Sequence, residues 1–216
     1  MKVAPSIIAA QFSAFQTEIE SVQRAGADLL HLDIMDGVFV PNITFGPMVV
    51  QAIREVTRLE LDAHLMITQP ERYLKVFIDA GLDWLSFHSE ATRDPLECLS
   101  AIQQSGVKAG LAINPGTPLS SVVEHLERLD YLLIMTVNPG FYGQKFMAEI
   151  LPKIRAAKDH IVRHNLPCQV QVDGGINAEN ALDVCRAGAD IIVAGAGIFK
   201  AENYKTAIEV LRCSKV

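Results

Sequence analysis

Three observations in the sequence predict an α/β fold, a single (β/α)8 or TIM barrel of eight parallel strands. A ten-residue pattern occurs three times, as RAGADLLHLD from residue 24, DAGLDWLSFH from residue 79 and RAGADIIVAG from residue 186. The glycines of these copies are 55 and 107 residues apart, close to multiples of 27, and one eighth of the 216 residues is also 27. One strand plus one helix fits that length, and eight such units make this barrel. The barrel then fills 1–216 as one domain, with a doubly wound open sheet as the alternative.

Eight short apolar runs, most of them rich in Val, Ile and Leu, are the predicted strands. They cover residues 3–8, 29–34, 61–66, 84–88, 108–113, 131–136, 169–173 and 191–194. Such runs are typical of parallel strands that are covered on both faces. In the repeated pattern, the glycine ends a helix in the left-handed conformation and the strand begins just after it.

The segments between the strands are predicted to be helices. Ser13 is placed to cap the first, with Gln16 three residues later and apolar Ile19 and Val22 at helical spacing. Pro70 is placed at the start of another helix, where its missing N–H costs no hydrogen bond.

Composition excludes several functional classes. The chain is 50% hydrophobic and 20% charged, which is enough for a sizeable core and excludes a disordered chain. The net charge of −6 argues against a nucleic acid or an anionic membrane as partner. No stretch approaches the roughly 18 apolar residues of a membrane helix, and the N-terminal region lacks the apolar core of a signal peptide. We therefore expect a cytoplasmic protein.

The four cysteines, Cys98, Cys168, Cys185 and Cys213, are scattered through the chain. They form no CxxC motif and have no histidine spaced for zinc. A chain with this apolar content needs no disulfides, so we expect free thiols in a reducing compartment, although three pairings are open to four cysteines.

Polar side chains end several predicted strands, where barrel enzymes carry their active sites. His31 and Asp33 end the second strand, His64 the third and Asp173 the seventh. Each alone could be a hydrogen-bonded structural residue, but four of them at one rim indicate a metal site. Neutral imidazole and carboxylate suit Zn²⁺, Fe²⁺ or Mn²⁺. Co²⁺ is a further possibility.

Glycine-rich loops follow the sixth, seventh and eighth strands. Their glycines are Gly140, Gly143, Gly174, Gly175, Gly195 and Gly197. Any single one could serve only to turn the chain. Three such loops on adjacent strands favour a phosphate held by backbone N–H groups. The rest of a dinucleotide-binding motif is absent, which argues against a nicotinamide cofactor.

Other strand-end residues have weaker signals. Methionine usually packs in the core, and this is one interpretation of Met35, Met66 and Met135. If these side chains reach the pocket, they form a flexible apolar wall that excludes water. The fourth strand ends in polar His88, with Glu90 two residues later, and the sequence assigns neither a role.

The segment LDIMDGVFVPNITFG, residues 32–46, resembles the signature of the ribulose-phosphate 3-epimerase family. The likeness covers the whole chain, with APS from residue 4, AHLM from 63, NPGTP from 114, MTVNPGFYGQ from 135 and VDGGIN from 172. It implies a TIM barrel with one divalent metal ion, commonly zinc, that interconverts D-ribulose 5-phosphate and D-xylulose 5-phosphate. That reaction belongs to the pentose phosphate pathway of carbohydrate metabolism.

The resemblance also implies roles for individual residues. His31, Asp33, His64 and Asp173 match the metal ligands, and the two aspartates double as acid and base. Ser6 and His64 would contact the substrate. The phosphate end would be lined by Gly140, Phe141, Tyr142, Gly143, Gly174, Gly175, Gly195 and Ala196.

Two positions depart from the family pattern. The family often has a small residue where Tyr142 stands, and usually a serine where Ala196 stands. These departures leave open a hexulose phosphate such as allulose 6-phosphate as the substrate.

The chemistry is consistent with these residues. Inverting a carbon beside a ketone means removing a proton from one face and returning one to the other, and a metal stabilises the enediolate between the two steps. A barrel lyase or decarboxylase of similar fold would carry Asp-x-Lys-x-x-Asp on the third strand, and LDAHLM from residue 61 has no lysine. A non-catalytic sugar-phosphate binder would need no carboxylate pair. We expect a phosphorylated ketose as the partner, and a homo-oligomer whose subunit number the sequence leaves open.

Overall fold

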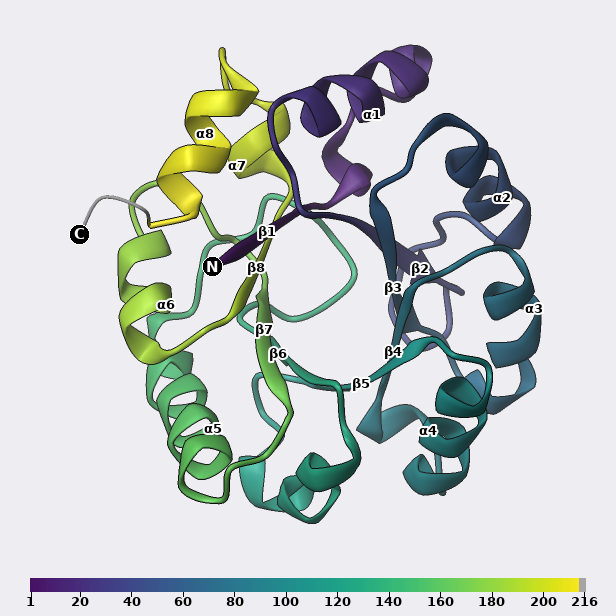
Figure 1. The fold of residues 1–216 in the computed structure, drawn as a ribbon, viewed down its shortest axis with the longest axis vertical. Helices are drawn as coiled ribbons and strands as arrows, with labels where there is room; N and C mark the ends of the chain where they lie inside the picture. Colours follow the sequence, from purple (N-terminus) through teal and green to yellow (C-terminus); the bar gives the residue numbers. More distant parts are fainter. Residues whose placement is uncertain (214–216) are drawn as a thin grey trace.

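Eight parallel strands form a barrel with helices around it (Figure 1). The computed structural model describes residues 1–213. The hydrogen-bonded order of the strands is β1-β8-β7-β6-β5-β4-β3-β2. Between β1 and β2 the barrel is closed by an isolated parallel bridge from Ser6 to His31 and by the Asp28 N–H, which donates to the Val3 carbonyl at 3.0 Å. The predicted (β/α)8 fold is confirmed.

The predicted strands agree with the observed ones to within one residue, except the first. They are β1 Lys2–Pro5, β2 Leu29–Met35, β3 Glu60–Met66, β4 Trp84–His88, β5 Lys108–Ile113, β6 Tyr131–Met135, β7 Gln169–Asp173 and β8 Ile191–Ala194. The first strand was predicted to reach residue 8, which is wrong because the chain turns into the 3-10 helix η1, Ile7–Ala9.

Helices connect most of the strands. The α-helices are α1 Phe15–Arg24, α2 Pro47–Val56, α3 Leu74–Asp79, α4 Pro95–Gln104, α5 Leu151–Arg163, α6 Ala181–Ala187, α7 Ala196–Phe199 and α8 Tyr204–Leu211. The 3-10 helices besides η1 are η2 Phe12–Ala14, η3 Pro70–Arg72, η4 Ser89–Ala91, η5 Leu119–Ser121, η6 Val123–Arg128 and η7 Ala148–Ile150. Only η5 and η6 lie between β5 and β6, where an α-helix was predicted.

Two predicted helix starts need correction. Ser13 is not the cap of α1, because it lies inside η2 and its hydroxyl accepts a hydrogen bond from the Gln11 amide at 3.1 Å. Pro70 begins a helical turn as predicted, but that turn is η3, and the α-helix starts only at Leu74.

The sequence repeat has a structural cause. The third residue of each copy is a glycine with the left-handed backbone that ends a helix, with φ of +93° at Gly26, +101° at Gly81 and +104° at Gly188. The aspartate two residues later then accepts a hydrogen bond from the N–H of the second residue of a neighbouring strand. Asp83 does so from Leu61, and Asp190 from Val170, each at 2.8 Å. Each copy therefore ends a helix and fixes the start of the adjacent strand.

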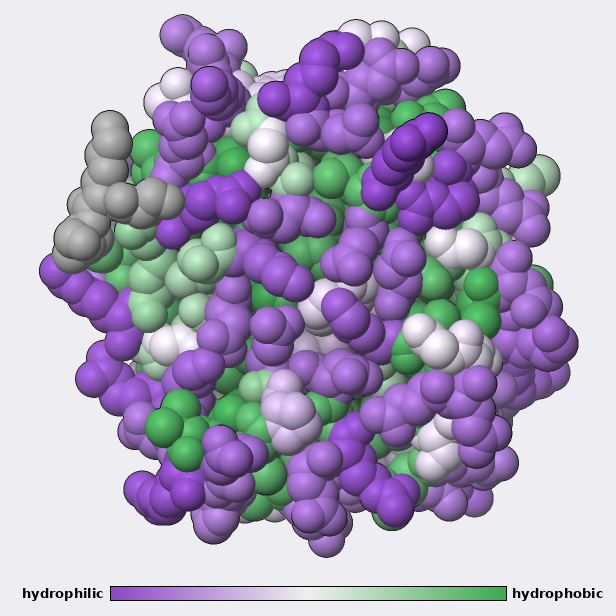
Figure 2. All heavy atoms as spheres, in the orientation of Figure 1, coloured by the Kyte–Doolittle hydropathy of each residue, from purple (hydrophilic) through white to green (hydrophobic). Residues whose placement is uncertain are grey.

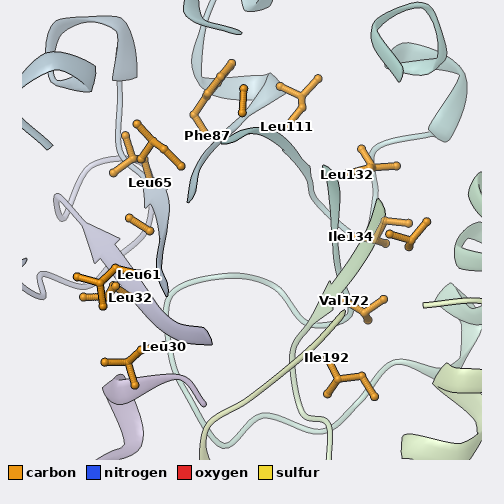
Figure 3. Packing of buried hydrophobic residues seen from close by; sticks show 14 of the residues in the cluster. Leu30, Leu32, Leu61, Leu65, Phe87, Leu111, Leu132, Ile134, Val172 and Ile192 are labelled. Atoms are coloured by element: carbon orange, nitrogen blue, oxygen red, sulfur yellow. The ribbon is translucent and has the colours of Figure 1, made fainter. Parts of the chain in front are cut away.

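Strand side chains alternate between two apolar regions. One set points outward against the helices and includes Leu30, Leu65, Phe87, Leu132 and Ile192 (Figure 3). The other set points into the barrel and includes Ala4, Leu29, Trp84, Tyr131, Ile191 and Val193. On the outside, much of the face in Figure 2 is hydrophilic, with smaller apolar areas between the polar side chains.

The prediction of four free thiols is wrong for one pair. Cys185 on α6 and Cys213 just after α8 form a disulfide, with their Cα atoms 6.8 Å apart. The two helices pack against each other, which brings together cysteines 28 residues apart in sequence. Cys98 and Cys168 are free, as predicted, and both are buried.

Within residues 1–213, every helix is too short or too polar to cross a membrane.

Candidate active site

The structure brings together the four polar residues that the sequence placed at one rim. His31 and Asp33 lie on β2, His64 on β3 and Asp173 at the end of β7, and one ligand atom of each lies within 4.8 Å of all the others. His31 and Asp33 are two residues apart, so both point into the barrel. The register of β2 and β3 sets Asp33 beside His64.

The two histidines each turn one ring nitrogen without a partner toward Asp33. His31 Nε2 lies 3.6 Å from Asp33 Oδ1, and His64 Nδ1 lies 3.7 Å from the same oxygen. Both nitrogens are buried and have no hydrogen-bond partner. Buried polar atoms nearly always have a hydrogen-bond partner, so these two nitrogens indicate a site for a ligand. Two imidazoles and two carboxylates are a donor set that suits a divalent cation such as Zn²⁺.

The other ring nitrogen of His31 is held by Asp62, which the sequence analysis did not single out. His31 Nδ1 lies 2.7 Å from Asp62 Oδ2, and both side chains are fully buried. The Tyr131 hydroxyl and the Gln171 amide also donate to the Asp62 carboxylate, at 2.9 and 2.6 Å. A carboxylate on the far nitrogen is the usual support of a metal-binding imidazole. The signal available in the sequence was spacing, since Asp62 precedes His64 by two residues and points to the same side of β3.

A glycine makes room for this buried network. A Cβ atom on Gly110 would lie 2.3 Å from the Tyr131 ring. The ring therefore crosses the barrel interior directly over β5, in edge contact with Trp84 at 5.1 Å between centroids.

The pKa values of the two aspartates are shifted in opposite directions. Burial raises the pKa of Asp173, and the neighbouring Asp33 charge raises it further, to about 7. Burial also pushes the pKa of Asp33 upward, but the neighbouring His31 charge outweighs it and holds the pKa well below its usual range. Ser6 donates a hydrogen bond to Asp33 Oδ2. Near neutral pH, Asp33 is therefore a carboxylate, while much of Asp173 carries a proton.

The two imidazoles also differ. Burial lowers the pKa of His64 to about 4, so this ring is neutral. Burial lowers the pKa of His31 too, but the charges of Asp62 and Asp33 outweigh it and raise the pKa well above its usual value.

A cavity of about 170 Å³ opens above the two aspartates. Its lining includes the predicted Ser6, Asp33, Asp173, Met35, Met66, Met135, Gly140, Phe141, Tyr142, Gly143, Gly174, Gly175, Gly195 and Ala196. The sequence analysis did not find Ile8, Val137, Pro139, Gln144, Ile176, Asn177, Val193 or, as a cavity residue, Gly197. His64 was expected to contact substrate, but it is fully buried and is not part of this lining.

The glycine loops pack tightly on one another at one side of the cavity. A Cβ on Gly175 would lie 2.6 Å from the Gln144 carbonyl oxygen, and one on Gly197 would lie 2.6 Å from the Ile176 carbonyl oxygen. Gly143 has open space around it but a φ of +79°. Within residues 1–213, the N–H groups of Gly143 and Gly175 donate to no backbone carbonyl. The glycines thus have the structural role weighed in the sequence analysis, and they also leave N–H donors beside the cavity.

Comparison with known proteins identifies the family of the chain. Residues 2–199 match the ribulose-phosphate 3 epimerase family. The ribulose-phosphate 3-epimerase of Bacillus subtilis is 48% identical over 219 residues, covering 100% of both chains. That of Synechocystis is 48% identical over 215 residues, covering 99% of this chain and 94% of the relative.

A solved structure shows the same fold at much lower identity. The 3-hexulose-6-phosphate synthase of Salmonella typhimurium matches with a TM-score of 0.70 and 18% identity, covering 98% of this chain and 96% of that one. At this identity the likeness concerns the fold alone. The full-length relatives decide the family: the chain belongs to the ribulose-phosphate 3-epimerase family and is an epimerase, an enzyme of the isomerase class.

Proposed function

We propose that the chain is a metal-dependent ribulose-phosphate 3-epimerase that interconverts D-ribulose 5-phosphate and D-xylulose 5-phosphate. One observation carries the proposal. Asp33 and Asp173, two carboxyl groups with widely separated pKa values, line a cavity beside two buried imidazole nitrogens that have no partner. His31, Asp33, His64 and Asp173 would hold the divalent cation, which we take to be Zn²⁺.

The carboxylates would move the proton. Inversion at carbon 3 needs a base on one face of the substrate and an acid on the other, and two carboxyl groups with separated pKa values provide both. Asp33 comes from β2 and Asp173 from β7, and across the closure of the barrel between β2 and β1, the strands β1 and β8 separate them. Their roles exchange when the reaction runs in reverse. The cation, when bound, supplies Lewis-acid stabilisation of the negative charge that develops on the substrate oxygens.

The remaining cavity residues would bind and enclose the substrate. Ser6 holds Asp33 in place through its hydrogen bond. Met35, Met66 and Met135 are all at most 6% exposed and give an apolar wall, which strengthens electrostatic interactions in the site by excluding water. The phosphate would lie against the loops of 140–143, 174–175 and 195–196 and accept hydrogen bonds from backbone N–H groups.

Several broader expectations belong to the same proposal. We place the enzyme in the pentose phosphate pathway and in the cytoplasm, as one barrel domain over 1–216 that forms a homo-oligomer and binds neither nucleic acid nor membrane. The Cys185–Cys213 disulfide is unusual for a reducing cytoplasm. Counting free thiols in protein taken directly from cells tests the compartment, and sedimentation tests the oligomer.

The decisive experiment is an NMR assay for solvent deuterium entering carbon 3 across a panel of ketose phosphates. We expect exchange and epimerisation of both pentulose 5-phosphates, and about one metal ion per chain in protein purified without chelator. Full activity in exhaustively metal-free protein would refute the proposed metal dependence. Faster turnover of allulose 6-phosphate would reassign the substrate, and exchange with no sugar of the panel would indicate a non-catalytic binder.

A further inference from the structure

His88 and Glu90 form a buried connection from the candidate metal site toward the surface. His64 Nε2 lies 2.9 Å from His88 Nε2, and His88 Nδ1 lies 3.1 Å from Glu90 Oε2. The side chain of His88 is fully buried, and that of Glu90 is 26% exposed. The Phe39 ring covers His88, with 4.8 Å between ring centroids.

The second oxygen of Glu90 is occupied by two donors from the loop after β5. The Asn114 N–H donates to Glu90 Oε1 at 2.9 Å, and the Thr117 hydroxyl donates to the same oxygen. Lys153 fixes this loop, because its ammonium group donates to the carbonyls of Asn114, Pro115 and Thr117 at 3.2, 2.7 and 2.6 Å. The loop is the NPGTP segment, which the proposed function leaves without a role.

The positions of the protons follow from these contacts. An ionised carboxylate only accepts hydrogen bonds, so His88 must carry its proton on Nδ1, facing Glu90. If His88 carries this one proton, its Nε2 has a lone pair, and His64 must carry its own proton on Nε2. The lone pair of His64 is left on Nδ1, the buried nitrogen that faces Asp33 at 3.7 Å.

We propose that Glu90 and His88 are positioning residues that fix His64 in the one tautomer able to bind a cation at the active site. The proposal rests on the proposed function, since it takes His64 as a metal ligand. The two histidine ligands are then supported differently. His31 is backed directly by the buried Asp62, whereas His64 is backed by a second imidazole and a partly exposed carboxylate.

Glu90→Gln tests this chain of hydrogen bonds with almost no change of shape. The Asn114 N–H and the Thr117 hydroxyl keep the amide oxygen of the new side chain at the Oε1 position, so its NH₂ group faces His88. His88 must then accept on Nδ1 and donate from Nε2, and His64 must carry its proton on Nδ1. That proton points into the site and opposes metal binding. Glu97→Gln is the matched control, because it removes one negative charge from an exposed position on α4.

The first measurement is the ¹⁵N NMR spectrum of the imidazole rings in metal-free protein, with peaks assigned by single histidine substitutions. In the parent and in Glu97→Gln we expect the proton on Nε2 of His64 and on Nδ1 of His88. In Glu90→Gln both protons move to the other nitrogen. A parent protein with the opposite tautomers, or with His88 protonated on both nitrogens, would overturn the proposal.

The second measurement is zinc affinity by competition with a chelator. Loss of a residue that supports a metal ligand typically costs about 10–100-fold in affinity, which we expect for Glu90→Gln and not for Glu97→Gln. Equal affinities in Glu90→Gln and the parent would contradict the positioning role. The proton positions are read without metal or substrate, so an inactive parent would refute the proposed function alone, and reversed tautomers in an active parent would refute this inference alone.

Discussion

The first prediction concerns the separate roles of Asp33 and Asp173. If they work from opposite faces of the substrate, replacing either one should stop epimerisation but leave proton exchange on one face. In Asp173→Asn, Asp33 remains to remove and return a proton, so one epimer should exchange its carbon 3 hydrogen with deuterium and keep its configuration. Asp33→Asn should show any exchange with the other epimer only. NMR of each pure epimer in deuterium oxide measures this.

The control for this pair is metal content, because both residues are candidate ligands. A variant that has lost its metal says nothing about the faces, so each is compared at equal occupancy. Metal-replete variants that both exchange the same epimer, or both epimers equally, would show that one face does all the chemistry.

Proton release on metal binding is the second prediction. In metal-free protein at pH 6, Asp173 with its pKa of about 7 is mostly protonated, and His31, with its raised pKa, is charged. His64 is neutral. A cation needs deprotonated ligands, so binding at pH 6 should release about two protons, and the proton from Asp173 should no longer be released well above pH 7, where Asp173 is already ionised. Metal affinity therefore rises with pH, more steeply below pH 7 than above it.

Titration calorimetry in buffers of different ionisation enthalpy measures the number of protons. Asp173→Asn is the matched control, since it should release about one proton fewer at pH 6 and the same number at high pH. Release that does not change between pH 6 and pH 8.5 in the parent would contradict the raised pKa of Asp173.

The sequence could predict the site residues that end a strand, and it could not predict what lies behind them. The sequence could predict His31, Asp33, His64 and Asp173, because a barrel collects the carboxyl ends of its strands at one rim. It could not predict the partners of Asp62, because Tyr131 and Gln171 are 69 and 109 residues away from it. Such contacts depend on how far a side chain reaches across the barrel, which no local pattern records.

The third prediction concerns the loops that line the proposed phosphate site. Ala196 lies in the wall of the cavity at the start of α7, beside N–H groups that would face the phosphate. Ala196→Asp places a negative charge there, and repulsion of the phosphate should raise KM on the order of tenfold or more with little change in fold. Ala196→Ser adds a donor and should lower KM by up to about tenfold.

Steady-state kinetics with the phosphorylated ketose measures both changes, and the matching unphosphorylated ketose is the control, because its KM should not respond to charge at this position. Equal effects on the two sugars would show that the phosphate lies elsewhere. Gly175 is a poor position for this test, since any side chain there meets the backbone of Gln144 and Phe146 and displaces the loop.

Strands were easier to predict than the elements between them. A parallel strand buried on both faces leaves a continuous apolar run, which local composition reveals. The connection from β5 to β6 has apolar residues too, but it forms the 3-10 helices η5 and η6 in place of an α-helix. Its apolar spacing alone does not separate the two helix types.

In the molecule as a whole, the same type of aspartate contact joins neighbouring strands at several places around the barrel. Asp28, Asp83 and Asp190 each accept a hydrogen bond from the N–H of the second residue of a neighbouring strand, and each also pairs with a cation from elsewhere in the chain. For Asp28 that cation is Arg212, which follows α8 and so ties the end of the chain to the start of the barrel. The repeat seen in the sequence therefore encodes contacts between distant units as well as local turns.

The last prediction concerns the contribution of the Cys185–Cys213 disulfide to the stability of the whole molecule. The disulfide closes a loop with a sequence separation of 28, for which chain entropy predicts a stabilisation of about 3–4 kcal/mol. Reduction, or Cys213→Ser, should therefore lower the free energy of unfolding by up to that amount. Activity of the folded enzyme should not change, because Cys185 and Cys213 lie toward the carboxyl ends of α6 and α8, at the end of the barrel away from the cavity. Denaturation with and without reductant measures the effect, and Cys213→Ser is its own control, since added reductant should not destabilise it further. Identical unfolding of the oxidised and reduced parent would show that α8 is held by its packing and by Arg212 without help from the disulfide.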